Sequence, residues 1–202
     1  MPRTQAANQR RREAQREKIL AGARKVFARK GMEATMAEVA AEAAVSHGLA
    51  YHYFANKEAL FHALVEQILQ ADPAGLRRVF EGSGTPGERL ALLLTTLVTF
   101  RRESPEFYQI LDQVERSQTT PADLRELMDR QGQLFFTVLR QLIVEGQATG
   151  EVAAGDPDQL ASAVGAYLEG LTRLALRYPG QFQQHGPDAK ILLRILKPVA
   201  NH

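Results

Sequence analysis

Helix starts are the feature of this sequence that most constrains its fold. At five places a residue suited to cap a helix stands directly before a proline, and proline is well tolerated at the first helical position. The five pairs are Thr85-Pro86, Ser104-Pro105, Thr120-Pro121, Asp156-Pro157 and Gly186-Pro187. Elsewhere, apolar residues recur at intervals of three and four, and strand-like alternation is missing. The sequence therefore predicts an all-α fold.

These signals divide the chain into about nine expected helices. Their ranges are 9–30, 36–43, 47–53, 57–81, 86–103, 105–117, 121–147, 157–178 and 187–198. The fourth helix is expected to kink or split at Asp72-Pro73, because a proline inside a helix removes one hydrogen bond and clashes with the preceding turn. The glycines of residues 82–84 and 150–155 indicate loops.

Charge is distributed unevenly. Residues 1–57 contain eleven Lys and Arg against five Glu, so they carry +6, and the rest of the chain carries −4. A basic end favours contact with a polyanion, because phosphate neutralisation dominates affinity for nucleic acid. A solvated basic tail is the alternative.

The cellular location follows from what the sequence lacks. There is no cysteine, no apolar run of the ~20 residues that span a bilayer, and no secretory signal near the N-terminus. We therefore expect a cytoplasmic protein with no membrane contact, associated with the nucleoid when it is bound to DNA.

Two very short helical units, 36–43 and 47–53, stand only a few residues apart, as in a helix-turn-helix. Helices this short are marginal in water unless they pack on a third helix, and the basic amphipathic helix 9–30 supplies one. The two units share residues that can form a small core. These are Val39, Ala40, Ala43, Val45 and Ala50. The segment therefore predicts a three-helix DNA-binding head.

The same segment carries a recognisable signature. Its residues are Ala40, Val45, Ser46, Gly48, Tyr51, Phe54 and the run Asn56-Lys57-Glu58-Ala59-Leu60. In this pattern, the chain resembles the tetracycline-repressor (TetR) family over about residues 16–65. The resemblance implies a DNA-binding domain over 1–57, a linking helix over 57–81, and a ligand-binding and dimerisation domain over 58–202.

Two positions depart from the family pattern. Ala44 stands where the family commonly has glycine, and Ala50 stands where it has a larger aliphatic residue. If position 44 is left-handed, alanine costs about 1 kcal/mol relative to glycine. Ala50 would leave space that a neighbour must fill.

Eight residues are candidate DNA contacts: Thr35, Ser46, His47, Gly48, Leu49, Tyr51, His52 and Lys57. Residues near the start of a recognition helix reach base edges and phosphates in the major groove. Gly48 would allow close approach of the DNA, and Ser46 would also cap the helix. Lys57 opposes the helix macrodipole, a penalty that a DNA phosphate would reverse.

Several roles in the head stay open between structure and contact. Thr35 is either an N-cap or a phosphate contact. We expect the ring of Tyr51 to pack against the head and its hydroxyl to reach a phosphate. Phe54 is expected in the core. The run Arg10-Arg11-Arg12 is either a basic arm on the DNA or a solvated tail.

The resemblance implies an effector pocket within about residues 60–147 and a homodimer formed by helices 157–178 and 187–198. Candidate ligand-binding residues are Phe100, Phe107, Tyr108, Leu111, Phe135, Leu139 and Tyr167. They suit an apolar or amphipathic ligand, although aromatic residues at helical spacing are more often ordinary core.

The sequence holds no phosphate loop, metal-ligand spacing or nucleophile motif, so we expect no enzyme, cofactor or metal site. The prediction is a repressor that a small effector releases from a palindromic, double-stranded operator. The alternative is a DNA-binding protein of the same fold that works through a protein partner or in chromosome organisation. A cavity in the larger domain favours the first, and a filled core favours the second.

Overall fold

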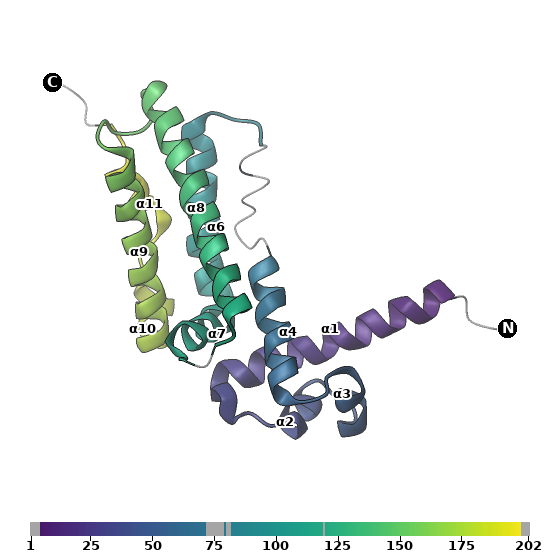
Figure 1. Ribbon diagram of the computed structural model, residues 1–202. Helices are drawn as coiled ribbons and strands as arrows, with labels where there is room; N and C mark the ends of the chain where they lie inside the picture. The colour runs from purple at the N-terminus through teal and green to yellow at the C-terminus, as the bar shows by residue number, and fades with distance from the viewer. Residues whose placement is uncertain (1–4, 72–78, 80–81, 119, 199–202) are drawn as a thin grey trace. The chain divides into compact units, whose positions relative to one another are not determined.

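The computed structural model describes residues 5–71, 79, 82–118 and 120–198, and every element in these ranges is helical, which confirms the predicted all-α fold (Figure 1). The elements are α1 (Gln5–Lys30), η1 (Gly31–Glu33), α2 (Met36–Glu42), α3 (His47–Tyr53), α4 (Lys57–Gln70), α6 (Pro86–Glu103), α7 (Pro105–Arg116), α8 (Ala122–Ala148), α9 (Pro157–Arg177), α10 (Pro179–His185) and α11 (Ala189–Ile195).

The predicted caps account for several helix starts. The Thr85 hydroxyl accepts from the Glu88 backbone N–H at 3.2 Å, and the Glu88 carboxylate accepts from the Thr85 N–H at 2.9 Å, which completes a capping box. Asp156 caps α9 by accepting from the Asp158 N–H at 2.8 Å. A proline at the first position therefore marks the start of both α6 and α9.

The C-terminal helix prediction needs correction. The range 187–198 was expected as one helix after Gly186-Pro187, but α11 begins at Ala189, where the Asp188 carboxylate accepts from the Lys190 N–H at 2.9 Å. Helix α10 was not predicted, because Tyr178 before Pro179 makes no side-chain cap. The expected kink at Asp72-Pro73 lies outside the described residues.

The chain divides into two compact units. The first, called the N-terminal unit, contains residues 1–70 and 109–125, and the second, the C-terminal unit, contains 71–108 and 126–202. Helix α7 contributes residues to both units. The domain boundary at residues 57 and 58 remains a prediction from the sequence.

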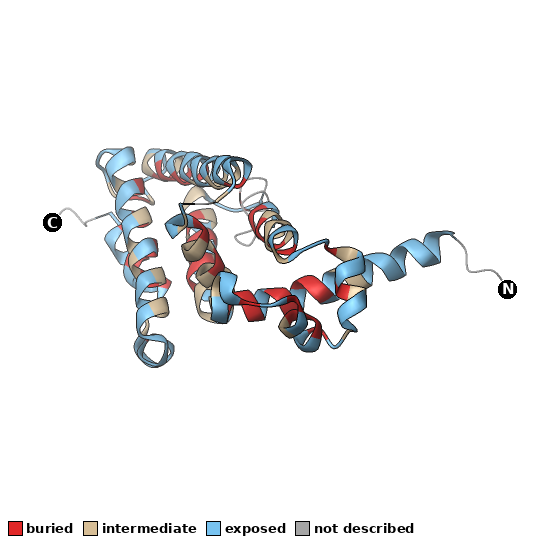
Figure 2. Cartoon of the chain, turned by 60° about the horizontal axis from the view of Figure 1, so that its bottom comes forward, coloured by how far each residue is buried: buried red, intermediate tan, exposed pale blue. Residues whose placement is uncertain are grey.

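Burial in the N-terminal unit begins halfway along α1 (Figure 2). The first turns of this helix are exposed, whereas Ile19, Ala23 and Phe27 are fully buried. Helix α1 contacts both α2 and α4, and the Phe27 and Phe61 rings meet edge to face with centroids 5.0 Å apart. The second half of α1 is therefore the support on which α2 packs, and α3 packs on α2 in turn.

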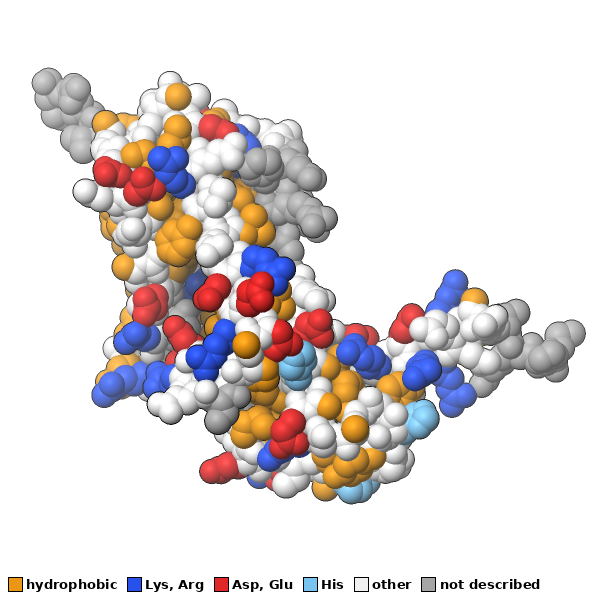
Figure 3. All heavy atoms as spheres, in the orientation of Figure 1, with side chains coloured by type: hydrophobic (Ala, Val, Ile, Leu, Met, Phe, Trp, Pro, Cys, Tyr) orange, Lys and Arg blue, Asp and Glu red, His pale blue; other side chains and the backbone are white. Residues whose placement is uncertain are grey.

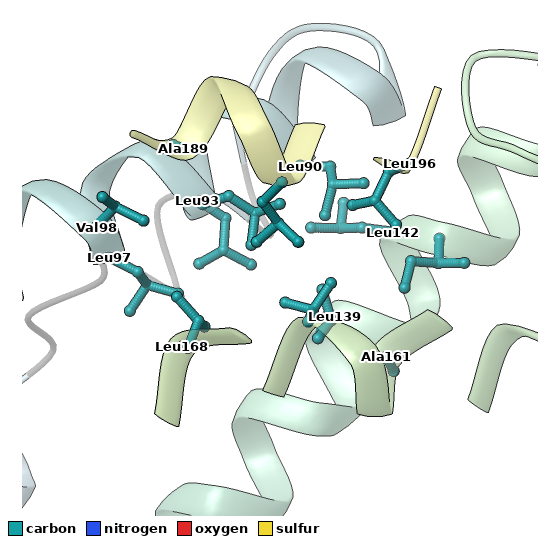
Figure 4. Packing of buried hydrophobic residues seen from close by; sticks show 14 of the residues in the cluster. Leu90, Leu93, Leu97, Val98, Leu139, Leu142, Ala161, Leu168, Ala189 and Leu196 are labelled. Carbon is teal, nitrogen blue, oxygen red and sulfur yellow. The ribbon is translucent and has the colours of Figure 1, made fainter. Parts of the chain in front are cut away.

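The C-terminal unit is held by a leucine-rich core to which α6, α8, α9, α10 and α11 contribute (Figure 4). Its fully buried members include Leu90, Leu93, Leu94, Leu139, Leu142, Ile143 and Val164. Repeats of three and four residues put the side chains of each helix on one face, so that neighbouring helices share one interior. Within the described residues, no helix is both long enough and apolar enough to cross a membrane.

Candidate DNA interface

The turn between α2 and α3 sets the angle of the second helix. Ala44 has φ +48°, its N–H donates to the Ala41 carbonyl at 3.0 Å, and the Val45 N–H donates to the Ala40 carbonyl at 2.9 Å. These two bonds form a Schellman motif, in which a left-handed residue ends the helix. Position 44 is thus left-handed, which is the condition under which alanine costs about 1 kcal/mol relative to glycine.

Removal of that strain gives a testable prediction. Ala44→Gly is expected to raise the free energy of unfolding by roughly 0.5 to 1 kcal/mol, because glycine adopts positive φ without a steric cost but loses more chain entropy. Thermal unfolding measures the change. The control is Ala41→Gly within right-handed α2, which should lower stability by up to about 1 kcal/mol. If both Ala44→Gly and Ala41→Gly lowered the free energy of unfolding, the backbone strain assigned to Ala44 would be contradicted.

Helix α1 holds the end of α2 at close range. A Cβ added to Gly22 would lie 2.8 Å from the Ala43 Cβ and 2.9 Å from the Ala43 backbone nitrogen, closer than side-chain carbons pack. The Lys18 ammonium also donates to the Ala44 carbonyl at 3.1 Å. The glycine in α1 therefore permits the contact that fixes the helix-turn-helix on its support.

Part of the positive charge in the head is neutralised internally. Glu42 lies 3.3 Å from the Lys25 ammonium and 3.1 Å from the Arg29 guanidinium, and their hydrogen bonds, led by that of Arg29, lower its pKa. Lys30 pairs with Glu38. These pairs are partly exposed and contribute little stability. They leave the exposed arginines of the first half of α1 as the freer positive charge.

Thr35 caps α2. Its hydroxyl accepts from the Glu38 N–H at 3.3 Å, and its own N–H donates to the Glu38 carboxylate at 3.0 Å. The hydrogen bonds from Lys30 and Thr35 lower the pKa of Glu38 to about 2. The capping interpretation of Thr35 is confirmed, and its contact with a phosphate remains a prediction.

Helix α3 has one buried side and one open side. Ala50 is fully buried and Phe54, just after the helix, is 6% exposed, as expected of core residues. The remaining candidates in the segment are exposed or half-buried. They are Ser46, His47, Gly48, Leu49, Tyr51 and His52. Figure 3 shows histidine side chains on the surface of this unit, and Lys and Arg side chains along the exposed half of α1.

The start of α3 is locally well defined. The Ser46 hydroxyl accepts from the Leu49 N–H at 3.2 Å, which confirms the predicted N-cap. The rings of His47 and Tyr51, one turn apart, meet edge to face at 4.9 Å. Nothing in the described chain lies within 4 Å of a Cβ built on Gly48. The glycine is therefore not required by packing within this part of the chain.

Lys57 has a partner that the sequence did not indicate. Its ammonium donates to the Met32 carbonyl of η1, while Asn56 caps α4 by accepting from the Ala59 N–H at 2.7 Å. The expected penalty of a cation at the start of α4 is thus offset within the fold, since the ammonium joins η1 to α4. An ammonium has three donors, so this bond leaves others for a phosphate.

The seven candidate ligand-binding residues fall into three groups. Phe100, Phe107 and Tyr108 contact one another through their rings. The other members of the C-terminal unit, Phe135, Leu139 and Tyr167, belong to its core or pack against it. Leu111 is half-buried in the N-terminal unit. The structure thus brings three of the seven together.

One pocket of about 200 Å³ lies in the C-terminal unit. It is lined by Thr95, Val98, Thr99, Arg102, Glu103, Asp188 and Ala189, none of which was predicted. Sequence reasoning also missed Arg101, whose guanidinium lies over the Tyr108 ring. A basic residue directly beside Phe100 was the only signal for it.

Comparison with known proteins agrees with this arrangement. Residues 19–64 match the family described as bacterial regulatory proteins, tetR family, and residues 86–189 match the C-terminal domain of BetI-type transcriptional repressors. The transcriptional regulator BetI of Brucella canis is 35% identical over 79 residues, 39% of this chain and 40% of that protein. The match therefore spans less than half of that relative.

Two further similarities extend over more of the chain. The nucleoid occlusion factor SlmA of Vibrio cholerae is 28% identical over 140 residues, 67% of this chain and 69% of that protein. Among solved structures, this chain is similar to NalD from Pseudomonas aeruginosa, the secondary repressor of the MexAB-OprM multidrug efflux pump. The two sequences are 26% identical, and the structures superpose with a TM-score of 0.64. The alignment covers 92% of this chain and 98% of NalD.

A capped and braced helix-turn-helix with one open face defines a DNA-binding transcription regulator, a class distinct from enzymes. Since family matches cover both the head and most of the body, the chain belongs to the TetR family.

Proposed function

We propose that this regulator is a homodimeric repressor that occupies a palindromic operator and leaves it when a small apolar or amphipathic effector binds. The observation that carries the DNA-binding part is the open face of α3, which packs through Ala50 and leaves Gly48 without a close neighbour in the described chain. The protein would act in the cytoplasm, on the nucleoid.

The proposed DNA contacts lie at the starts of three helices. Thr35 stands before α2, and Lys57 begins α4. The start and open face of α3 are formed by Ser46, His47, Gly48, Leu49, Tyr51 and His52. Backbone N–H groups at helix starts bind phosphates, which would fix the register of α3 on the duplex. His47, Leu49 and His52 would then reach base edges or phosphates in the major groove.

Lys57 provides the test of this interface. Lys57→Ala is expected to weaken binding to different DNA sequences by a similar factor and to reduce the slope of log affinity against log salt by about 1, because one phosphate contact is lost. Operator titration at several salt concentrations measures the slope. Arg130→Ala, which removes an exposed cation from α8, is the matched control. An unchanged slope with Lys57→Ala would remove this residue from the interface.

Exposed apolar side chains support the proposed dimer through residues 157–178 and 187–198. Leu174 and Tyr178 at the end of α9 are 43% and 47% exposed, and Ile191 and Ile195 of α11 are 49% and 59% exposed. The two isoleucines are four residues apart and lie on one face of α11. A second copy of the chain would cover them and supply the second recognition helix.

Helix α7 gives the proposed effector a route to the DNA-binding head. Phe107 and Tyr108 lie in its first turn. Gln113, later in the same helix, donates from Nε2 to the Phe27 carbonyl at 3.0 Å and to the Ala28 carbonyl at 3.4 Å. These carbonyls belong to α1, the support of the helix-turn-helix. A shift of α7 would therefore move that support, and a coupling of ~1 to 3 kcal/mol changes operator affinity by roughly 5- to 150-fold.

A second candidate function is chromosome occupancy or control by a protein partner. One observation favours it: the similarity to a nucleoid occlusion factor, which is 28% identical over 140 residues. Thermal-shift screening followed by operator titration separates the candidates. A ligand that stabilises the protein and weakens operator binding supports the repressor, and ligands that leave operator affinity unchanged support the second function.

A further inference from the structure

Arg101, near the end of α6, lies over the ring of Tyr108, which contacts two further aromatic rings. Its guanidinium carbon is 4.6 Å from the centroid of the Tyr108 ring. The rings of Phe100 and Phe107 are 5.0 Å apart, those of Phe107 and Tyr108 are 5.1 Å apart, and those of Phe100 and Tyr108 are 6.0 Å apart. We call Phe100, Phe107 and Tyr108 the aromatic triad. All four residues belong to the C-terminal unit.

Within the described ranges, the hydrogen bonds of Arg101 go only to neutral acceptors. Nε donates to the Thr172 hydroxyl at 3.1 Å, and Nη1 donates to the Leu97 carbonyl at 3.0 Å. The Thr172 hydroxyl donates in turn to the Leu168 carbonyl at 3.1 Å, so its position is fixed. Nη2 donates to no acceptor in the part of the chain that the structure describes, which leaves the outer edge of the guanidinium free.

Arg101 also lacks a counter-charge. Among the described residues, no carboxylate lies within 4.0 Å of it, whereas Arg140 pairs with Asp158 at 2.7 Å and Arg173 pairs with Glu169 at 2.7 Å. Burial lowers the pKa of Arg101 and raises the pKa of the Tyr108 phenol. A desolvated cation is costly unless something pairs with it, and the carbonyls at the end of α6 compensate only part of the charge.

We propose that Arg101 binds the carboxylate of an amphipathic effector whose apolar part lies against the aromatic triad. The guanidinium is planar and can donate from two N–H groups to the two oxygens of one carboxylate, which suits the free edge that includes Nη2. The triad supplies apolar surface next to that charge. This inference rests on the proposed effector response and gives that effector its chemical class.

The same cluster disfavours a cationic ligand. Aromatic rings alone would suit a quaternary ammonium group, which binds over ring faces. Here the Tyr108 face already carries the Arg101 guanidinium, and a second cation would meet like charge in a partly desolvated site. The alternative role for Arg101 is to cap the α6 carbonyls, in which case the charge of a ligand would make no difference.

Three probes with one tail and different head groups test the proposal: octanoate, octan-1-ol and octyltrimethylammonium. Isothermal titration of the full chain with each probe gives its dissociation constant. We expect octanoate to bind at least 10-fold more tightly than the alcohol, and the ammonium to bind most weakly. Tightest binding of the ammonium, equal binding of all three, or no binding by any of them would overturn the proposal. Because all three probes are compared on the unaltered protein, this test does not depend on the folding of a variant.

Arg101→Gln then identifies the residue responsible. The ratio of octanoate to octanol affinity should fall to about 1 in this variant, and Arg101→Lys, which keeps the charge without the planar fork, should retain part of it. The control Arg130→Gln removes an exposed cation from α8 and should leave the ratio unchanged. Thermal unfolding reports whether each variant folds, and a preserved ratio in folded Arg101→Gln would overturn the proposal.

Operator titration with saturating octanoate distinguishes this inference from the proposed function. If octanoate binds through Arg101 and operator affinity falls, the result supports both the anion site and the proposed effector-released repressor. If octanoate binds through Arg101 but operator affinity is unchanged, the anion site stands and release by this effector class fails. Weakened operator binding by a neutral or cationic ligand that binds more tightly than octanoate would leave the repressor intact and overturn the anion site.

Discussion

Gly48→Leu is expected to lower operator affinity by roughly 100-fold, equivalent to ~2.7 kcal/mol, while the protein stays folded. No atom of the described chain lies within 4 Å of a Cβ at this position, so the free protein has room for the side chain. The substitution should even favour α3, because leucine is a better helix former than glycine. In the complex, the leucine would stand where the recognition helix approaches the DNA. Operator titration and thermal unfolding of the same samples measure both effects.

Gly132 provides a matched control for this substitution. It lies in α8, is exposed, and likewise has no atom of the described chain within 4 Å of an added Cβ. Gly132→Leu should therefore stabilise its helix to a similar extent and leave operator affinity unchanged. Equal operator affinity of the two variants would contradict the assignment of the open face of α3 as the DNA-binding surface.

The second large effect is expected at the proposed dimer interface. Replacement of both Ile191 and Ile195 by aspartate should convert the protein to monomers and weaken specific operator binding by roughly 1,000-fold or more, because one recognition helix reads only one half-site. The charges would be placed on a face that is open in the single chain, so the monomer should still fold. Light scattering measures the mass, and operator titration measures the affinity.

Leu92→Asp is the control for that experiment. Leu92 of α6 is 55% exposed, and so similar in exposure to the two isoleucines, but it lies outside the proposed interface. This variant should remain dimeric and bind the operator normally. A dimeric Ile191→Asp/Ile195→Asp protein would show that the chains pair through another surface.

The helix-turn-helix was predictable because its signals are local. Ser46 and Thr35 cap helices within three residues of themselves, and the left-handed Ala44 stands directly after the C-cap of α2. Their conformations depend mainly on neighbouring residues, so a sequence pattern contains the necessary information. The buried positions of Ala50 and Phe54 follow from the same periodicity.

Other features depend on residues far apart in the chain. Lys57 bonds the carbonyl of Met32, and Arg101 bonds Thr172, which is 71 positions away. Neither contact leaves a local pattern. Helix α10 was missed for a different reason, since a proline after an uncapped tyrosine lacks the usual start signal. A sequence pattern does not separate core aromatics from ligand-binding ones, because both kinds occur at helical spacing.

Hydroxyl-radical footprinting on DNA fragments selected by the full chain is the most direct test of the account. We expect two protected segments, related by two-fold sequence symmetry and centred about 34 to 36 Å apart, one for each recognition helix. This protection should persist in excess competitor DNA. Protection that covers any fragment uniformly and disappears with competitor would contradict a dimer that reads an operator.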